Sequence, residues 1–498
     1  MRHPRPLVTA LVLLAGCMVG PDYRRPSVAL PARWRAAGRR TAAPTPTTDL
    51  AGWWHAFGDQ TLDAIVNQAL AENLDLKTVA ARVREARAAR VIAASGLFPS
   101  IGTSASYART RPFSKHSQFG SIVPGNLAET NLFQGDFDAS WELDVFGGIR
   151  RGIEAADADV AAAEDDERDV RVTLLAELAR NYVEIRSLER RLAIAAENIE
   201  NQRSSVALTE DRFRTGLASE LDVRQARSLL ATTESVVPVL ESQREQTLHA
   251  LGVLVGREPN ALQDDLATPA PIPGAAAPDA LAVRIPVGLP SDLLRRRPDV
   301  RRAERQVAAA TARIGVATAD LFPKVSLTGL AGLESISTGD FFTSGSRYFT
   351  AGPTISWRIF EGGRLRANVA VHDARADQAL HGYVKAVLTA LEDVEDSLVA
   401  YGKERNRHDA LVSAADENRR SVVLARDLYV HGLGTYLAVL DAERAQYASE
   451  DTLVQGDEGL VLDLVATYKA LGGGWAPPAE EVAAPMIPAP VKAFWSRP

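Results

Sequence analysis

Cysteine is nearly absent from this chain: among its 498 residues only Cys17 carries a thiol. A disulfide within the chain is therefore excluded. The eight histidines are scattered without the spacing of metal ligands. The sequence also holds no G-x-S-x-G, phosphate-binding-loop or H-E-x-x-H pattern. Because the sequence shows no pattern that indicates a nucleophile, a metal site or a cofactor site, we expect a protein that is not an enzyme and needs no cofactor.

Positive charge is in the minority. The 56 Lys and Arg residues stand against 63 Asp and Glu residues, which gives a net charge of −7. Nucleic acids and anionic membrane faces attract proteins with clustered Lys and Arg, so we expect no nucleic-acid partner. Three consecutive arginines do precede Pro298 and Asp299. A helix that begins at the proline, with the acid in its first turn, accounts for this segment better than a nucleic-acid patch does.

Long apolar runs are also missing. No stretch reaches the roughly 20 residues that a helix needs to span a bilayer. A shorter apolar run, residues 7–14, follows Arg2 and Arg5 and ends in Ala15 and Gly16. A basic start, a short apolar run and small residues at its end predict a secretory signal peptide over residues 1–16.

Cys17 follows these small residues directly, in a pattern that resembles a bacterial lipoprotein cleavage site. By that resemblance its thiol takes a diacylglycerol and becomes the mature N-terminus. Acyl chains of the palmitate type would then hold residues 17–52, the lipidated N-terminal segment, on a membrane. Met18, rather than Asp, follows the cysteine, which by the same resemblance directs the protein to the outer membrane. An incidental buried cysteine is the alternative.

The chain contains an internal repeat with a period of roughly 220 residues, far longer than in a solenoid. We interpret each half as a whole structural unit made by duplication. Repeat 1 covers residues 53–256 and repeat 2 covers residues 291–474, with a proline-rich connector over 257–290 and a tail over 475–498. The paired motifs are Leu97-Phe98-Pro99 with Leu321-Phe322-Pro323, Trp141 with Trp357, Phe146-Gly147-Gly148 with Phe360-Glu361-Gly362-Gly363, and Ala250-Leu251-Gly252 with Ala470-Leu471-Gly472.

Apolar and polar residues alternate strictly over residues 133–145, which is the period of a strand with two unlike faces. The matching segment, residues 348–359, alternates in the same way, and weaker alternation over 101–107 and 325–333 supplies a partner for each. We therefore expect two strand hairpins, within residues 100–146 and 324–360. The acidic face of the first carries Asp136, Asp138, Glu142 and Asp144.

Proline is absent from residues 148–237 and 362–475, where Ala, Glu, Arg and Leu dominate, so we expect long helices. A helix over residues 148–215 would be about 100 Å long, which no compact globule holds. Apolar residues step by four and three through residues 380–398, the spacing of a packed helix pair. Glycine-containing segments at 215–219 and 431–435 interrupt the helices. We expect helical hairpins with their turns at one pole of a very long molecule and the strands at the other.

Strands with one apolar and one acidic face suit a wall between lipid and water. Only closed barrels and helices satisfy every backbone group inside a bilayer. Four strands cannot close a barrel, since the smallest barrels have about eight. Several subunits must therefore contribute strands to one barrel. An ordinary antiparallel sheet with one wet face is the alternative.

The ordered motifs of the chain resemble those of the TolC-type outer-membrane factors, in the lipoprotein (NodT-like) branch associated with resistance-nodulation-division efflux pumps. The resemblance covers nearly the whole chain. It rests on Gly20-Pro21-Asp22-Tyr23 after Cys17, Trp53-Trp54 with Phe57-Gly58-Asp59, Asn73-Leu74-Asp75-Leu76, Arg295-Arg296-Arg297-Pro298-Asp299-Val300 with Ala303-Glu304, and Phe322-Pro323.

The resemblance implies a mainly α-helical fold with a membrane β-barrel portion. In a homotrimer, each subunit would give four strands to a twelve-stranded β-barrel and long helical hairpins to a periplasmic α-barrel. The function implied is a passive duct in the cell outer membrane. It would expel drugs or small molecules that an inner-membrane resistance-nodulation-division pump delivers through a periplasmic adaptor, a membrane fusion protein. The exit channel of a type I protein-secretion system is the alternative. A stand-alone porin would need more strands, and a purely structural coiled-coil lipoprotein leaves the strands unexplained.

By the same resemblance the two glycine-containing turns dock the adaptor. Turn chemistry alone is the alternative, but an apolar leucine at each exposed turn favours docking. The turn residues are Gly216, Leu217, Ala218, Ser219, Gly432, Leu433, Gly434 and Thr435.

Asp441 is the gate candidate. The resemblance implies a closed tip held by acids one turn apart on the final helix, and Ala438 stands where the other acid would be. Three copies of Asp441 around a threefold axis would repel one another and attract cations, whereas a solvated helix face is the alternative. We also expect the strand acids named above to line the barrel lumen and make the pore mildly cation-selective.

Overall fold

The structure, a computed structural model, describes residues 18–36, 50–111, 129–276, 278, 281–282 and 287–476. The predicted signal peptide, the lipidation site Cys17 and nearly all of the predicted C-terminal tail lie outside the described residues. The chain divides into two compact units. Unit 1 comprises Met1–Pro26, Arg84–Ala162 and Glu304–Gly382, and unit 2 comprises Ser27–Val83, Ala163–Ala303 and Tyr383–Pro498.

The two compact units do not follow the two sequence repeats. Each unit takes segments from both repeats. The reason is that the long helices of each repeat run from one unit into the other. Each unit therefore contains segments of both repeats packed together. The two tandem repeats are present as repeated elements, but they do not form two separate compact units.

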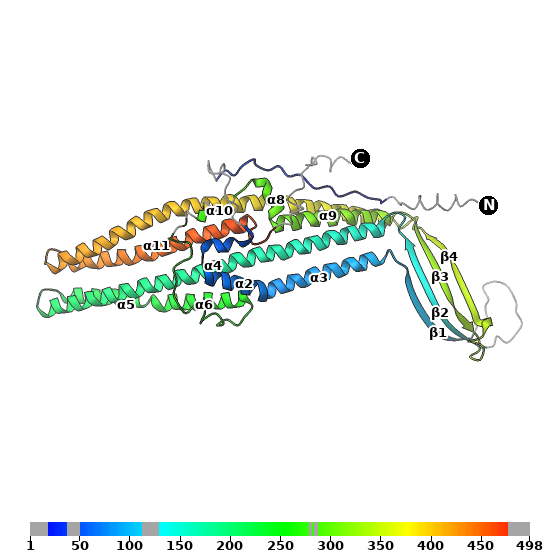
Figure 1. The fold of residues 1–498 in the computed structure, drawn as a ribbon, viewed down its shortest axis with the longest axis horizontal. Helices are drawn as coiled ribbons and strands as arrows, with labels where there is room; N and C mark the ends of the chain where they lie inside the picture. The colour runs from blue at the N-terminus through cyan, green and yellow to red at the C-terminus, as the bar shows by residue number, and fades with distance from the viewer. Residues whose placement is uncertain are drawn as a thin grey trace. The chain divides into compact units, whose positions relative to one another are not determined.

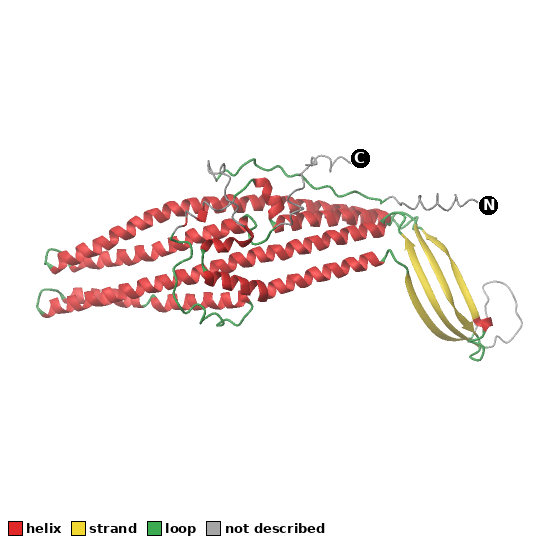
Figure 2. Ribbon diagram, viewed as in Figure 1, coloured by secondary structure: helices red, strands yellow, loops and turns green. Residues whose placement is uncertain are grey.

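Helices account for most of the described chain, and strands form a single sheet (Figures 1 and 2). The two longest helices occupy equivalent places in the two repeats and have 67 residues each. The helices of repeat 1 are η2 (Leu50–Phe57), α2 (Gln60–Glu72), α3 (Leu74–Ser95), α4 (Gly148–Arg214), α5 (Glu220–Glu234) and α6 (Val237–Val255). Those of repeat 2 are η3 (Pro290–Asp292), α8 (Leu293–Arg296), α9 (Pro298–Ala319), η4 (Ser344–Ser346), α10 (Arg364–Val430) and α11 (Tyr436–Ala470).

Unit 1 contains the sheet, whose strands follow one another in the order β1-β2-β3-β4. All three pairings are antiparallel. The two predicted hairpins are both present, and pairing of β2 with β3 joins them across the repeats. The strands are β1 (Ser100–Thr110), β2 (Thr130–Leu143), β3 (Lys324–Ser335) and β4 (Arg347–Ser356).

The prediction that the acidic strand runs to residue 145 is wrong at its end, because β2 stops at Leu143. The next residue, Asp144, instead caps α4. Its carboxylate accepts hydrogen bonds from the backbone N–H groups of Ile149, at 3.0 Å, and Arg150, at 2.9 Å. These N–H groups have no partner within the helix, so a carboxylate at this place stabilises its first turn.

The repeated motifs meet at the end of the sheet where β2 leads into α4. The indole of Trp141 donates to the carbonyl of Leu97 at 2.9 Å, and the indole of Trp357 donates to the carbonyl of Leu321 at 3.1 Å. Each tryptophan thus holds the Leu-Phe-Pro motif of its own repeat. Phe146 stacks on Phe322, with ring centroids 4.7 Å apart. We call Trp141, Phe146, Phe322 and Trp357 the aromatic rim.

The core of unit 2 lies along the middle of the long helices. Leu178, Tyr182 and Ile185 on α4 are fully buried, and Trp53 stacks on Tyr468 of α11 at 5.0 Å. On α10 the buried residues include Val387 and Val394. Their spacing of seven agrees with the helix-pair pattern expected from the sequence.

Candidate functional site

The four strands place nearly all of their large apolar side chains on one face of the sheet. The register aligns Phe137 with Ala331, and Ala331 with Phe349, so the odd-numbered residues of neighbouring strands share this face. These side chains are largely exposed in the single chain, up to 82% for Phe349. A continuous exposed apolar surface of this kind indicates contact with lipid or with another protein. The face includes Ile101, Tyr107, Phe137, Trp141, Leu327, Phe349 and Ile355.

The opposite face carries the predicted lumen acids of β2. Asp136 is buried against neighbouring strands, and its carboxylate accepts from the Ser104 hydroxyl at 3.0 Å and the Gln134 amide at 2.9 Å. The Tyr348 hydroxyl donates to the same carboxylate at 3.3 Å. Asp136 is therefore held by hydrogen bonds within the sheet.

The other predicted lumen acids differ in their surroundings. Asp138 lies opposite Gly102, and Glu142 has Lys324 Nζ at 3.8 Å. The structure thus brings Asp136, Asp138 and Glu142 to one face of β2, whereas Asp144 lies beyond the strand as the cap of α4. Whether any of them lines a channel stays a prediction.

Both outer strands of the sheet have an unpaired edge. Among the described residues, β1 pairs only with β2 and β4 pairs only with β3. The two edge strands are 11 and 10 residues long. Such edges present free backbone N–H and C=O groups, which pair readily with a strand of another chain.

The turn that joins α4 to α5 ends α4 with a C-terminal capping motif. Gly216 adopts a positive φ of 76°, and the N–H of Leu217 donates to the Arg212 carbonyl at 2.7 Å. Ser219 caps α5, because its hydroxyl accepts from the Asp222 N–H while the Asp222 carboxylate accepts from the Ser219 N–H. Leu217 is 67% exposed at the tip.

The second turn, between α10 and α11, repeats this geometry. Gly432 has a positive φ of 73°, and the N–H of Leu433 donates to the Leu428 carbonyl at 2.9 Å. Leu433 is 77% exposed. Thr435 occupies the position of Ser219, but its side chain makes no capping hydrogen bond.

The two turns are held together within unit 2. The guanidinium of Arg212 lies 4.7 Å from the ring centroid of Tyr429 and donates to the Val430 carbonyl at 3.0 Å. A small core beneath them contains Leu229 and Tyr436. The eight predicted docking residues therefore form two neighbouring tips, each carrying one exposed leucine.

Asp441, the gate candidate, lies on an exposed face of α11. Two buried acids on the same helix were not predicted from the sequence. Glu443 accepts from the Ser205 hydroxyl at 2.6 Å and from Arg426 at 3.1 Å. Glu450 accepts from Arg419 at 2.7 Å. The partners of both acids come from α4 and α10. In the sequence, only the interruption of the apolar pattern of α11 could have indicated that these two acids are buried.

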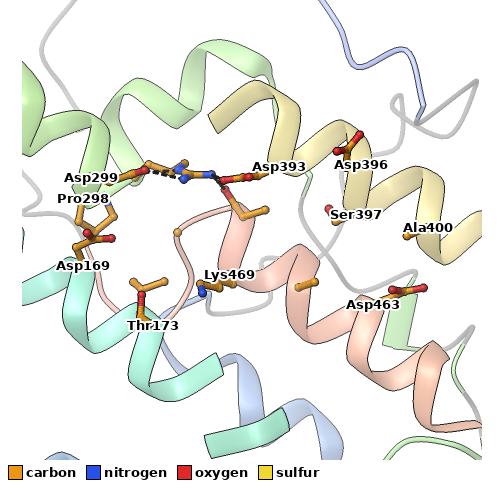
Figure 3. A pocket seen from close by; sticks show the side chains of 15 residues that line it. Asp169, Thr173, Pro298, Asp299, Asp393, Asp396, Ser397, Ala400, Asp463 and Lys469 are labelled. Carbon is orange, nitrogen blue, oxygen red and sulfur yellow. Dashed lines mark hydrogen bonds and ion pairs between the residues drawn. The ribbon is translucent and has the colours of Figure 1, made fainter. Parts of the chain in front are cut away.

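A cavity of about 420 Å³ lies in unit 2 between α4, the start of α9, α10 and α11. Figure 3 shows Asp299 and Asp393 on either side of one guanidinium, which belongs to Arg297. Burial and the neighbouring charge of Glu404 raise the pKa of Asp463 to about 6. Burial, followed by the charge of Asp299, also raises the pKa of Asp169.

Arg297 has a structural role in this cavity. Its guanidinium lies 2.6 Å from the Asp299 carboxylate and 2.7 Å from that of Asp393. The helix α9 begins at Pro298 with Asp299 in its first turn, as the sequence predicts. The arginine run therefore supports local folding through Arg297 rather than forming a free basic patch.

In the part of the chain that the structure describes, no group of three or more His, Cys, Asp or Glu side chains is arranged to hold a metal ion. No described helix combines the length and the apolar composition needed to cross a bilayer.

Comparison with known proteins gives consistent matches over both repeats. A family model described as outer membrane efflux protein matches residues 65–257 and 289–473. The pyoverdine export outer membrane protein OpmQ of Pseudomonas aeruginosa is 35% identical over 472 residues, covering 94% of this chain and 96% of that protein. The solvent efflux pump outer membrane protein SrpC of Pseudomonas putida is 34% identical over 479 residues, covering 94% and 97%.

A solved structure agrees with these matches. The outer-membrane channel OprN aligns with a TM-score of 0.84 and 39% identity, over 92% of this chain and 100% of that one. The family model alone covers more than half of the chain. The chain belongs to the outer membrane efflux protein family, and it is an outer-membrane component of an efflux system.

Proposed function

We propose that three copies of this chain form a passive duct through the outer membrane, which expels drugs or other small molecules and catalyses no reaction. An inner-membrane pump of the resistance-nodulation-division class would deliver the cargo through a periplasmic adaptor. The observation that carries the proposal is the open sheet of unit 1, with its apolar face and two unpaired edges.

The unpaired edges support assembly of several copies. A sheet edge inside a bilayer leaves backbone groups without partners, at a cost of several kcal/mol per group. The four strands of one chain are too few to close on themselves, because the smallest barrels have about eight. Pairing β4 of each copy with β1 of the next removes every edge in a ring of three copies.

The height of the apolar face supports a position in the bilayer. Phe133 and Trp141 stand eight residues apart on β2, or about 26 Å along the strand. With the usual barrel tilt of about 40°, this distance corresponds to roughly 20 Å along the membrane normal. Aromatic residues at both ends of an apolar band about 25 Å tall are typical of outer-membrane barrels.

In such a barrel the acidic face of β2 lines the lumen. Asp136, Asp138 and Glu142 from each copy would favour cations over anions. Reversal potentials measured across a salt gradient test this selectivity, and an anion-selective pore contradicts it.

The periplasmic tip carries the proposed gate. Three copies of the exposed Asp441 around the axis would repel one another and attract cations. Asp441→Ala should then raise the leak of ions through the closed channel, and an unchanged conductance in planar bilayers counts against the gate.

The lipid anchor is proposed at Cys17, which precedes the described residues. Several acyl chains on this residue hold a protein on a membrane independently of its barrel, since each buried CH₂ contributes about 0.8 kcal/mol. Metabolic labelling with palmitate, lost in Cys17→Ala, tests this assignment.

The cargo is proposed from the names of relatives. OpmQ is described as a pyoverdine export protein and SrpC as part of a solvent efflux pump. Both descriptions name small molecules, which favours a small-molecule duct over the exit channel of a type I protein-secretion system.

A photo-crosslinking residue at Leu217 or Leu433 tests the partner. Both side chains are exposed at the tips of the turns. We expect each to capture a periplasmic adaptor of the resistance-nodulation-division class, whereas a crosslinker at the buried Tyr436 serves as control. Capture of a protein-secretion adaptor would keep the duct and change the cargo. Absence of any periplasmic partner would overturn the docking assignment.

A further inference from the structure

The first described residues of the chain are bound to the start of α4. The N–H of Val19 donates to the carbonyl of Phe146 at 3.2 Å. Arg151, on the first turns of α4, is 1% exposed, and its guanidinium donates to the Val19 carbonyl at 3.1 Å. The same guanidinium donates to the Asp22 carboxylate at 2.7 Å and to Glu154 at 2.7 Å. Most of the hydrogen bonds of this buried charge therefore go to the N-terminal segment.

This segment packs tightly against the rest of unit 1. A Cβ atom on Gly20 would lie 2.4 Å from the Cα of Gly315 on α9. A Cβ atom on Gly315 would lie 2.8 Å from the Arg151 side chain. The absence of side chains at both glycines lets the segment lie directly on α9 beside the guanidinium.

A second attachment follows a few residues later. The Tyr23 hydroxyl donates to Glu304 at 2.9 Å, and Arg25 donates to the other oxygen of the same carboxylate at 2.5 Å. Glu304 is 5% exposed. Burial raises the pKa of Tyr23, so its hydroxyl keeps the proton that it donates. Residues 18–25 are thus fixed to both α4 and α9, and we call them the N-terminal clamp.

We infer that the N-terminal clamp sets the point at which the lipid anchor leaves the protein, and that Arg151 is its positioning residue. This inference rests on the proposed lipidation of Cys17. Met18 packs against Gly147, directly after Phe146 of the aromatic rim. Because Cys17 is joined directly to Met18, an acyl group on Cys17 would be attached one residue away from the clamp.

The clamp and the buried charge depend on each other. Without the segment, Arg151 keeps the Glu154 carboxylate but loses the Asp22 carboxylate and the Val19 carbonyl. A buried guanidinium without its partners is strongly unfavourable. The segment therefore stays bound, and the acyl chains enter the bilayer at one level relative to the sheet.

Hydrogen–deuterium exchange of the full-length protein tests the clamp. Asp22→Ala removes a charge-assisted hydrogen bond from an exposed side chain, so the protein still folds. We expect the Val19 N–H to exchange about 10- to 100-fold faster. Arg24→Ala is the matched control, because it removes a charge from an exposed residue of the same segment. Equal exchange in the parent and the Asp22→Ala variant would overturn the inference.

A palmitate analogue bearing a diazirine, fed to cells, tests the position of the anchor. In the parent we expect intramolecular crosslinks from the acyl chain to peptides that contain the aromatic rim. Gly20→Ala should reduce them about tenfold at unchanged amounts of labelled outer-membrane protein, because its methyl group displaces the clamp from α9. Arg24→Ala should leave them unchanged. Crosslinks that Gly20→Ala does not alter would contradict the inference, whereas a chain without label would refute the lipidation itself.

Discussion

Several charged side chains of unit 2 are buried. Arg297 is 9% exposed and bridges two aspartates, and Glu443 is 4% exposed between Arg426 and Ser205. Such pairs offset only part of the cost of desolvation, so replacing the whole pair by apolar residues is often neutral. Removing one partner is costly, because the other charge stays buried. These buried ion pairs therefore determine which side chains meet between the helices, but they add little net stability.

Asp463 gives this buried charge a measurable pH dependence. Its folded-state pKa of about 6 lies above the unfolded value of about 3.9. Its contribution to stability is therefore fully present below about pH 3.9 and is lost as the pH rises through 6. Asp463→Asn should raise the free energy of unfolding at pH 7.5 by about 2 kcal/mol, after allowance for partial solvent screening. Thermal melts at pH 4 and 7.5 measure this gain, which should shrink at the lower pH. An equal gain at both pH values would contradict the assignment.

Helices and strands show how local chemistry places the functional surfaces. The two helical turns have matching glycines and exposed leucines, yet only Ser219 forms a capping box. The strands expose an apolar face, which no described helix or second described sheet covers in the single chain. Each of these differences yields a matched pair of variants.

The turn before α5 should be more sensitive to loss of its cap than the turn before α11. Ser219→Ala removes the hydroxyl that accepts from Asp222 and should cost about 1 kcal/mol of unfolding free energy. Thr435→Ala removes no capping bond and should change the stability by less than about 0.5 kcal/mol. Thermal or urea unfolding of both variants measures the difference. Equal losses would show that the capping box does not stabilise the turn.

Adjacent residues on β4 should respond in opposite ways to a charge. Phe349 lies on the apolar face and Thr350 on the other. Phe349→Arg should destabilise the membrane-inserted protein by about 2–4 kcal/mol if its side chain faces the middle of the bilayer. Thr350→Arg should be tolerated, because the proposed lumen on that face would be filled with water. Yields of folded protein in outer membranes compare the two variants. A reversed result would exchange the two faces of the barrel.

The periodicity of the sequence was sufficient to predict the sheet and its two faces, because alternation in β2 continues to Trp141 without interruption. It was insufficient at Asp144, where an acid that fits the alternation instead caps a helix. Glu443 and Glu450 were missed for a related reason: each also accepts a hydrogen bond from α4, more than 200 residues away in sequence, Glu443 from Ser205 and Glu450 from Asn198. Local patterns predict elements and faces, whereas buried ion pairs depend on which helices the fold brings together.

The complete protein is predicted to differ from the single chain in what it exposes. The apolar face and the two edges of the sheet are satisfied only when lipid covers the first and other copies pair with the second. The organisation into repeats fits this requirement, because each repeat supplies one hairpin and the pairing of β2 with β3 joins them. Duplication alone therefore gives an open four-stranded sheet, and symmetry must complete the barrel.

Native mass spectrometry of the full-length protein, released intact from outer membranes, tests this central claim most directly. With 53.6 kDa calculated for the printed chain, three copies without their signal peptides should give a complex of roughly 155 kDa plus the lipid anchors. A complex of three chains is the result that we predict. A stably folded, membrane-inserted single chain would contradict the account, because its sheet would keep two open edges inside the bilayer.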